Sequence, residues 1–258
     1  MTMAINTHRA QPRLPEQWPA ALSPDVLSLI DIPTPYLVTD LDALATRYAR
    51  FSAALPGVAT FYAMKCNSTS EIVQTLHRQG AGFEIASIGE LHKLQALGVD
   101  PAETLYSNPI KPPAHVAAAH AAGLWRFGFD SVGELHKIAE YAPGSAVYLR
   151  LRVDDSTSVF PLSRKFGAEL GRAYDLMVLA RRLGLRPYGV TFHVGSQCAN
   201  PSAWRQAVAA AGTLMRRQPR QVDACEGVQR VGAHRAGRSW GEEIGRASGR
   251  ERVSAGVY

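Results

Sequence analysis

The chain has 258 residues, 46% of them hydrophobic and 19% charged, which is enough apolar material for one or two domains. The net charge of +6 comes from basic residues scattered along the chain without a nucleic-acid motif, so we expect no nucleic-acid partner. The three cysteines form no CxxC pair, so we expect no metal site and a reducing compartment such as the cytoplasm. Neither an apolar signal core nor a run of about 18 apolar residues occurs, so we expect a cytoplasmic protein with no membrane span.

The N-terminal part of the chain contains many prolines. Residues 1–34 are predicted to be a lead-in without regular structure. Residues 36–39 have the composition of a short strand, and Asp40 is a typical helix-capping residue. We therefore expect a strand at 36–39 and a helix from Asp40 to about Leu55, ended by a Pro-Gly pair.

From Val58 onward, apolar strand-like segments alternate with helical segments. We predict strands at residues 59–65, 82–86, 104–108, 125–129, 147–153 and 189–194. Capping boxes such as Ser87-x-x-Glu90 and Ser131-x-x-Glu134 mark the starts of helices just after strands. This alternation indicates an α/β fold with a parallel sheet, and units that repeat every ~20 residues favour a (β/α)8 TIM-type barrel, truncated to about six βα units.

Polar side chains gather on the inner face predicted for these strands. Side chains alternate between the two faces of a strand, and we expect the more apolar face of each barrel strand to pack against the helices. The residues left pointing inward are Lys65, Glu84, Asp130, Arg150, Arg152 and His193. Active sites of such barrels lie at the carboxyl ends of the strands, so we predict a site there. The alternative for the two acids and the two arginines is a structural ion-pair network.

Lys65 ends an apolar segment, and its amine offers the most specific chemistry in this set. A lysine that is removed from water has a lowered pKa and can form a Schiff base with a carbonyl group. The alternative is a lysine that ends a strand and extends its amine into water.

Several short segments resemble the pyridoxal phosphate (PLP)-dependent decarboxylases of ornithine, lysine, arginine and diaminopimelate, which have the alanine-racemase fold type. The segments are FYAMKCN (61–67), GFEIAS (82–87), YSNPIK (106–111), FDS (129–131), LR (149–150), DDS (154–156), KFG (165–167) and HVGS (193–196). Each is weak alone, but they occur in family order and are jointly specific. The DDS segment is similar to the ornithine/lysine branch.

The resemblance implies a role for each site residue. Lys65 would hold PLP as a Schiff base, His193 would stack on the pyridine ring, and Ser196 would bind the phosphate beside accessible backbone amides. Glu84 and Arg150 match family positions in the cofactor cavity. The implied reaction is decarboxylation of a small amino acid substrate, ornithine or lysine, to a diamine, and full-length family members form homodimers with shared active sites.

The resemblance also divides the chain. Residues 35–217 are expected to form a partial PLP-binding barrel domain, after the lead-in of residues 1–34. Residues 218–258 have no counterpart of the family's glycine-rich phosphate loop or C-terminal β-domain, and their composition predicts a disordered tail. We therefore expect a truncated, inactive decarboxylase. The alternatives are a non-catalytic interaction or regulatory protein, and a racemase or PLP-carrier protein with the same barrel.

Overall fold

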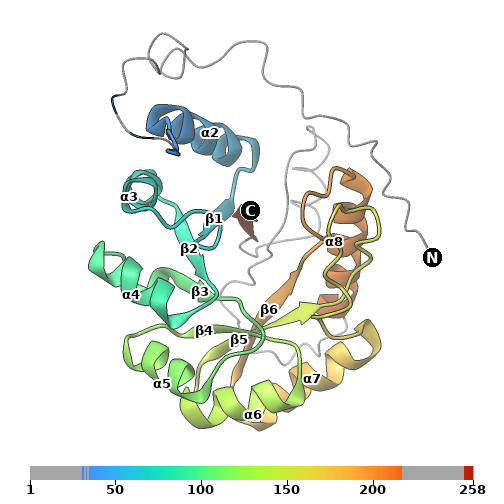
Figure 1. The fold of residues 1–258 in the computed structure, drawn as a ribbon. Coiled ribbons are helices and arrows are strands. Elements are labelled where there is room, and N and C mark those ends of the chain that lie inside the picture. The colour runs from blue at the N-terminus through green and yellow to red at the C-terminus, as the bar shows by residue number, and fades with distance from the viewer. Residues whose placement is uncertain (1–30, 32, 34, 217–252, 258) are drawn as a thin grey trace, which may run out of the picture.

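A curled parallel sheet forms the centre of the computed structural model, which describes residues 31, 33, 35–216 and 253–257 (Figure 1). Its strands are β1 (Val58–Ala63), β2 (Gly82–Ile85), β3 (Thr104–Tyr106), β4 (Arg126–Phe129), β5 (Ala146–Leu151), β6 (Arg186–Phe192) and β7 (Val253–Val257). The order across the sheet is β6-β5-β4-β3-β2-β1-β7, and all neighbours are parallel. Strands β1 to β6 therefore follow one another as in a (β/α) barrel, which confirms the predicted architecture.

Helices cover the outer side of the curl (Figure 1). They are α2 (Leu41–Ala54), α3 (Ser70–Arg78), α4 (Ile88–Ala96), α5 (Pro113–Ala121), α6 (Val132–Tyr141), α7 (Leu170–Arg182) and α8 (Pro201–Arg216), and a short 3₁₀ turn, η2, spans Pro101–Glu103. Asp40 accepts the N–H of Ala43 at 2.9 Å and is the predicted N-cap of α2. Ser87 and Ser131 cap α4 and α6 in the same way. Within the described ranges, no helix has the length and apolar character needed to cross a bilayer.

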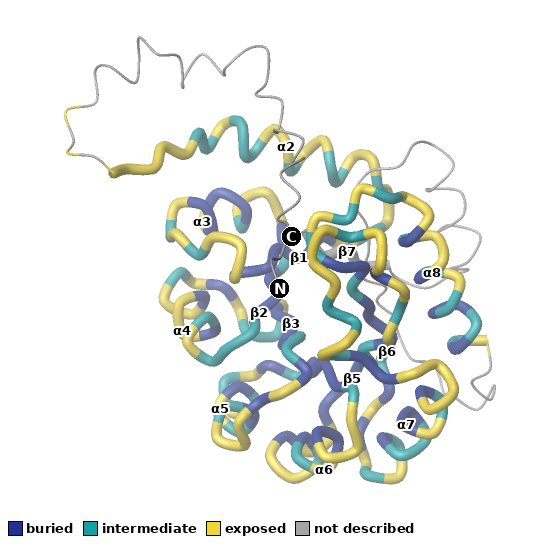
Figure 2. The backbone as a smooth tube through the Cα atoms, turned by 45° about the vertical axis from the view of Figure 1, so that its right-hand side comes forward, coloured by how far each residue is buried: buried dark blue, intermediate teal, exposed yellow. Residues whose placement is uncertain are grey.

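Two apolar clusters lie on opposite faces of the sheet. The larger one joins strand residues such as Phe83 and Phe127 to the helices. The smaller one, Phe61, Leu105 and Tyr148, comes from β1, β3 and β5 and lies inside the curl. Alternate strands supply each layer of side chains inside a TIM barrel, and these three residues follow that rule. Figure 2 shows buried residues along the strands and exposed residues on the outer sides of the helices.

The strand predicted at residues 36–39 is wrong. These residues carry no regular structure, and Leu37 is 96% exposed. A strand is stable only beside a partner, and the outer edge of β1, from Val58 to Tyr62, is already paired with β7.

Strand β7 also departs from the prediction of a disordered tail at residues 218–258. Residues 253–257 pair with β1 over their whole length. The N–H and C=O groups along an exposed strand edge favour the addition of a further strand, even one without an obvious sequence pattern. The remainder of that tail, and nearly all of the predicted lead-in at residues 1–34, fall outside the described residues.

Candidate cofactor site

The predicted site residues lie where the parallel strands end. Lys65 follows β1, Glu84 lies on β2, Arg150 lies on β5, and His193 and Ser196 follow β6. Lys65 is exposed and Glu84 is buried, whereas Arg150, His193 and Ser196 are half-buried. Their common position at the carboxyl edge of the sheet results from the parallel topology, because every strand ends on the same side.

Lys65 stands on a turn and not on the strand itself. Strand β1 ends at Ala63, and the N–H of Cys66 bonds to the Ala63 carbonyl at 3.0 Å. The strand thus ends two residues earlier than predicted, and Lys65 is exposed. This exposure disagrees with the expected removal from water and agrees with the alternative of a lysine that ends a strand and extends into water.

His193 is the point at which charges from several elements meet. Burial is the main cause that lowers the pKa of His193 from 6.5 to about 4. The positive charges of Arg150 and Lys65 lower this pKa further, and the Asp155 carboxylate opposes them. Charged residues at the ends of β1 and β5 therefore act on one imidazole that follows β6 and is neutral at neutral pH.

A backbone contact fixes the tautomer of that imidazole. The N–H of Gly195 donates to Nδ1 of His193 at 2.9 Å, so the neutral ring carries its proton on Nε2. Gly195 has a φ of +85°, and a Cβ atom there would lie 1.9 Å from Oγ of Ser158. Only glycine suits both the left-handed backbone and this close approach.

The lowered pKa of His193 has a consequence for stability. Between about pH 4 and pH 6.5 the unfolded chain binds a proton at this residue and the folded chain does not. The free energy of unfolding should therefore fall as the pH is lowered through this window, and His193→Asn should flatten that part of the profile. Urea unfolding at a series of pH values measures both slopes, with His136→Asn, on the exposed side of α6, as the control. Equal slopes for the wild type and His193→Asn would contradict this assignment.

Glu84 and Arg150 lie inside the curl, whereas Arg152 does not. Burial raises the pKa of Tyr148 above its usual range, and the charge of Glu84 raises it further. The Arg150 guanidinium lies 4.9 Å from the centre of the Phe166 ring. The inward position predicted for Arg152 is wrong, because β5 ends at Leu151 and the strand alternation stops there.

Arg152 and Asp130 have partners elsewhere. The side chain of Arg152 pairs with Glu169 at 2.7 Å on the surface. Asp130 accepts the N–H of Gly167 at 2.8 Å and so holds the end of the loop between β5 and α7. These partners of Arg152 and Asp130 thus lie in the loop between β5 and α7 and at the start of α7.

The backbone amides near Ser196 are already engaged, contrary to the prediction that they are accessible. The N–H of Gly195 donates to His193, and the N–H of Ser196 donates to the Phe160 carbonyl at 3.0 Å. The hydroxyl of Ser196 is therefore the group in this segment that suits a phosphate oxygen. Gln197, which follows, has a φ of +56°, a conformation that is uncommon for a residue with a side chain and often marks a functional loop.

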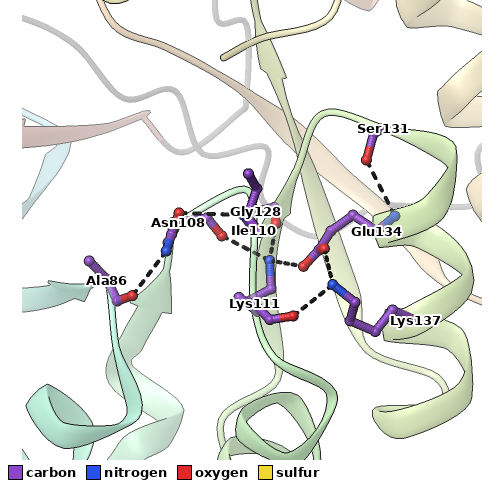
Figure 3. Close-up of polar contacts among 8 residues, drawn as sticks. All are labelled: Ala86, Asn108, Ile110, Lys111, Gly128, Ser131, Glu134 and Lys137. Atoms are coloured by element: carbon purple, nitrogen blue, oxygen red, sulfur yellow. Dashed lines mark hydrogen bonds and ion pairs between the residues drawn. The ribbon is translucent and has the colours of Figure 1, made fainter. Parts of the chain in front are cut away.

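A buried ionic cluster beside this site was missed from the sequence (Figure 3). The side chain of Lys111 is fully buried, and its Nζ contacts Glu134 at 2.8 Å, the Asn108 carbonyl at 2.9 Å and the Gly128 carbonyl at 2.6 Å. Burial lowers the pKa of Lys111 to about 8, although the nearby Glu134 carboxylate opposes the shift. Lys137 pairs with the same carboxylate at 2.6 Å.

This cluster joins the ends of three neighbouring strands. The Asn108 side chain donates to the Ala86 carbonyl at 3.3 Å, just after β2, while Lys111 holds carbonyls next to β3 and on β4. In the sequence, this cluster could have been suspected only from the lysine of the YSNPIK segment and the glutamate of a capping box. Neither residue indicates which residue it pairs with. The cluster therefore has a supporting role for the strand ends that carry the site.

The side chains at the strand ends fit PLP, which is an aromatic aldehyde with a phosphate group. An accessible lysine amine suits the aldehyde, a neutral imidazole can lie against an aromatic ring, and a hydroxyl can bind a phosphate oxygen. Lys65, His193 and Ser196 supply these three groups from the segments that follow β1 and β6.

Comparison with known proteins agrees with this fit. Residues 41–223 match the family described as pyridoxal-dependent decarboxylase, pyridoxal binding domain. The lysine/ornithine decarboxylase of Selenomonas ruminantium is 39% identical over 183 residues, which cover 71% of this chain and 47% of that protein. Antizyme inhibitor 2 of Xenopus laevis is 39% identical over 173 residues, which cover 67% of this chain and 38% of that protein.

A solved structure extends the likeness to three dimensions. A crystal structure described as SrLDC in complex with PLP and cadaverine matches this chain with a TM-score of 0.82 and 31% sequence identity. The match covers 91% of this chain and 64% of that chain. The chain spans about half the length, or less, of the curated relatives it matches. The matched profile, the barrel-type sheet and the residues at its carboxyl edge together show that this chain belongs to the pyridoxal-dependent decarboxylase family, whose cofactor is PLP.

Proposed function

We propose that this protein is a PLP-dependent decarboxylase that converts lysine or ornithine to the corresponding diamine. The observation that carries the proposal is the placement of Lys65, Arg150 and the neutral His193 at the carboxyl edge of the sheet, at the ends of β1, β5 and β6. The similarity to a lysine/ornithine decarboxylase, and to a structure that contains cadaverine, supports this substrate class. Bound PLP supplies a ring that accepts the electrons left when the carboxyl group departs.

Each side chain has a proposed task. The amine of Lys65 would hold PLP through its aldehyde carbon. The imidazole of His193 would contact the pyridine ring in its neutral form, so no charge would have to lose its water there. Arg150 and Glu84 place one positive and one negative charge in the cavity, with Arg150 steadied by the Phe166 ring. The Ser196 hydroxyl binds the phosphate.

Ser196→Ala should weaken PLP binding without changing how the cofactor is attached. Loss of one hydrogen bond to a charged phosphate is expected to raise the dissociation constant roughly tenfold. The absorption band of bound PLP should stay in place, because it reports on the bond to Lys65. A spectroscopic titration measures both quantities, with Ser156→Ala, an exposed serine, as the control. A shifted band at unchanged affinity would contradict the role of Ser196.

The test of the proposed activity compares two polypeptides. The 258-residue polypeptide on its own is proposed to bind PLP without turnover, because the part of it that matches covers only 47% of the lysine/ornithine decarboxylase of Selenomonas ruminantium. A fusion of residues 1–216 to the part of the Selenomonas enzyme beyond the matched region should release labelled CO2 from carboxyl-labelled lysine or ornithine. It should form cadaverine or putrescine in equal amount, and Lys65→Ala should abolish both products.

One alternative function, that of a non-catalytic protein, is favoured by a specific observation. A relative named as an antizyme inhibitor, and not as a decarboxylase, is as similar to this chain as the enzymes are. A non-catalytic PLP-barrel protein would bind PLP at Lys65 yet release no CO2 in the fusion. A racemase would instead change the optical rotation of its amino acid without releasing CO2.

Assembly and location are also proposals. By family resemblance we propose a homodimer with shared active sites, and light scattering of the fusion tests the dimeric mass. We propose a cytoplasmic location because the exposed thiol of Cys66 is free and adjoins the reactive lysine, a state that a reducing compartment preserves.

A further inference from the structure

The loop between β5 and α7 leaves the sheet and returns to the place where it left. The N–H of Arg152 bonds to the Ala168 carbonyl, and the N–H of Ala168 bonds to the Arg150 carbonyl, both at 2.8 Å. These two bonds close the neck of a loop that spans residues 153–167. Large apolar side chains within the loop point to solvent, since Val159 is 59% exposed and Phe160 is 53% exposed. Burial of these side chains therefore does not explain the shape of the loop.

One carboxylate organises the interior of this loop. Asp155 is only 3% exposed. Its Oδ2 accepts the N–H groups of Leu162 and Ser163 at 2.5 and 2.8 Å, and its Oδ1 accepts the Ser163 hydroxyl at 2.7 Å. The Asp155 carbonyl accepts both the N–H and the hydroxyl of Ser158, at 3.0 and 2.8 Å. A single residue thus ties together both sides of the loop.

The atoms that Asp155 holds touch the segment proposed to bind the cofactor phosphate. Phe160 and Ser196 form an antiparallel bridge, with N–H to carbonyl distances of 3.0 and 3.3 Å. Ser158 lies so close to Gly195 that no Cβ atom fits between them. Both contacts come from the stretch of loop that the Asp155 carboxylate closes.

The Asp155 carboxylate is ionised, as a group that accepts three hydrogen bonds needs to be. Burial raises the pKa of Asp155, but the hydrogen bonds from Ser163 and Leu162 together outweigh burial, so its pKa lies below the ordinary value. The group is therefore ionised at neutral pH and can accept all three bonds at once. An asparagine of the same shape offers one oxygen and places an amide group against N–H donors.

We infer that Asp155 is a positioning residue for the phosphate-binding segment of the cofactor site. It holds the β5–α7 loop in the shape that clamps the backbone of Ser196 and covers Gly195, without touching the cofactor itself. The inference rests on the proposed function in that it takes Ser196 as the phosphate ligand. It adds a residue, and a loop, to the groups that determine cofactor affinity.

The test compares PLP with pyridoxal, which has the same aldehyde and ring but no phosphate. In the 258-residue chain, Asp155→Asn should raise the dissociation constant for PLP roughly tenfold and change that for pyridoxal less than about twofold. Ser163→Ala removes one of the three bonds and should have a smaller effect of the same kind. Asp154→Asn is the matched control, because Asp154 is exposed and its carboxylate accepts the N–H of Ser156. Hydrogen exchange at the amides of residues 160 and 196 should quicken in Asp155→Asn.

The outcomes separate this inference from the proposed function. Unchanged PLP affinity in Asp155→Asn, or an equal loss of PLP and pyridoxal binding, would overturn the positioning role. If the wild-type chain binds neither ligand, the proposed cofactor chemistry fails, and the exchange experiment still decides the inference. In that case faster exchange at residues 160 and 196 supports the clamp, and unchanged exchange overturns it.

Discussion

Lys65→Ala should abolish the covalent attachment of PLP to this chain. A Schiff base needs a primary amine, and Lys65 carries one on an exposed turn at the carboxyl edge of the sheet, which also holds the neutral His193. The positive charges around His193 also favour an anionic cofactor at this edge of the sheet. Borohydride reduction of the PLP-treated chain, followed by peptide mapping, measures the attachment.

The controls make the position specific. In the wild type the reduced label should lie on the peptide that contains Lys65, and in Lys65→Ala the label should fall to background. Lys93→Ala, which removes an exposed amine on α4, should leave the label unchanged. A label on another lysine at limiting PLP would show that Lys65 is not the residue that binds PLP covalently.

Lys111→Met should lower the free energy of unfolding by about 3–5 kcal/mol, the usual cost of breaking a buried ion pair. The change leaves the Glu134 carboxylate, whose side chain is 4% exposed, with Lys137 as its remaining ionic partner. It also removes the donor that the carbonyls of Asn108 and Gly128 share. The Lys111 side chain is fully buried, so hydration offsets little of either loss.

Urea unfolding of three variants tests this account. Lys137→Met should cost less, because Lys137 is partly exposed and Lys111 still neutralises Glu134. The double variant Lys111→Met with Glu134→Leu should recover much of the stability, since no unpaired charge stays buried. A loss below about 1 kcal/mol for Lys111→Met would show that the cluster does not hold the strand ends.

The sequence was sufficient where local rules decide the outcome. The apolar alternation located strands β1 to β6, and serines or Asp40 at helix starts located α2, α4 and α6, because periodicity and capping depend on nearby residues. Errors arose where a strand stops. Lys65 and Arg152 follow the last residues of β1 and β5, and the alternation that predicts an inward side chain ends with the strand.

Contacts between distant residues were beyond these rules. Lys111 is paired with a glutamate 23 positions later, and a lysine after a strand usually reaches water. Asp155 finds its donors seven and eight residues further on, in a loop without periodicity. Strand β7 owes its pairing to the open edge of β1 and not to its own pattern.

The order of strands also bears on how the chain folds. Strands β1 to β5 each pair with the next strand to be synthesised, so this part of the sheet can grow stepwise from contacts of short sequence separation. The β1–β7 ladder is different, because its two strands are separated by about 190 residues and closing so long a loop is slow. During synthesis the β1 edge therefore stays open while the other five strands assemble. Nascent chains should be most vulnerable to misassociation at β1, and native-state opening should begin with the release of β7.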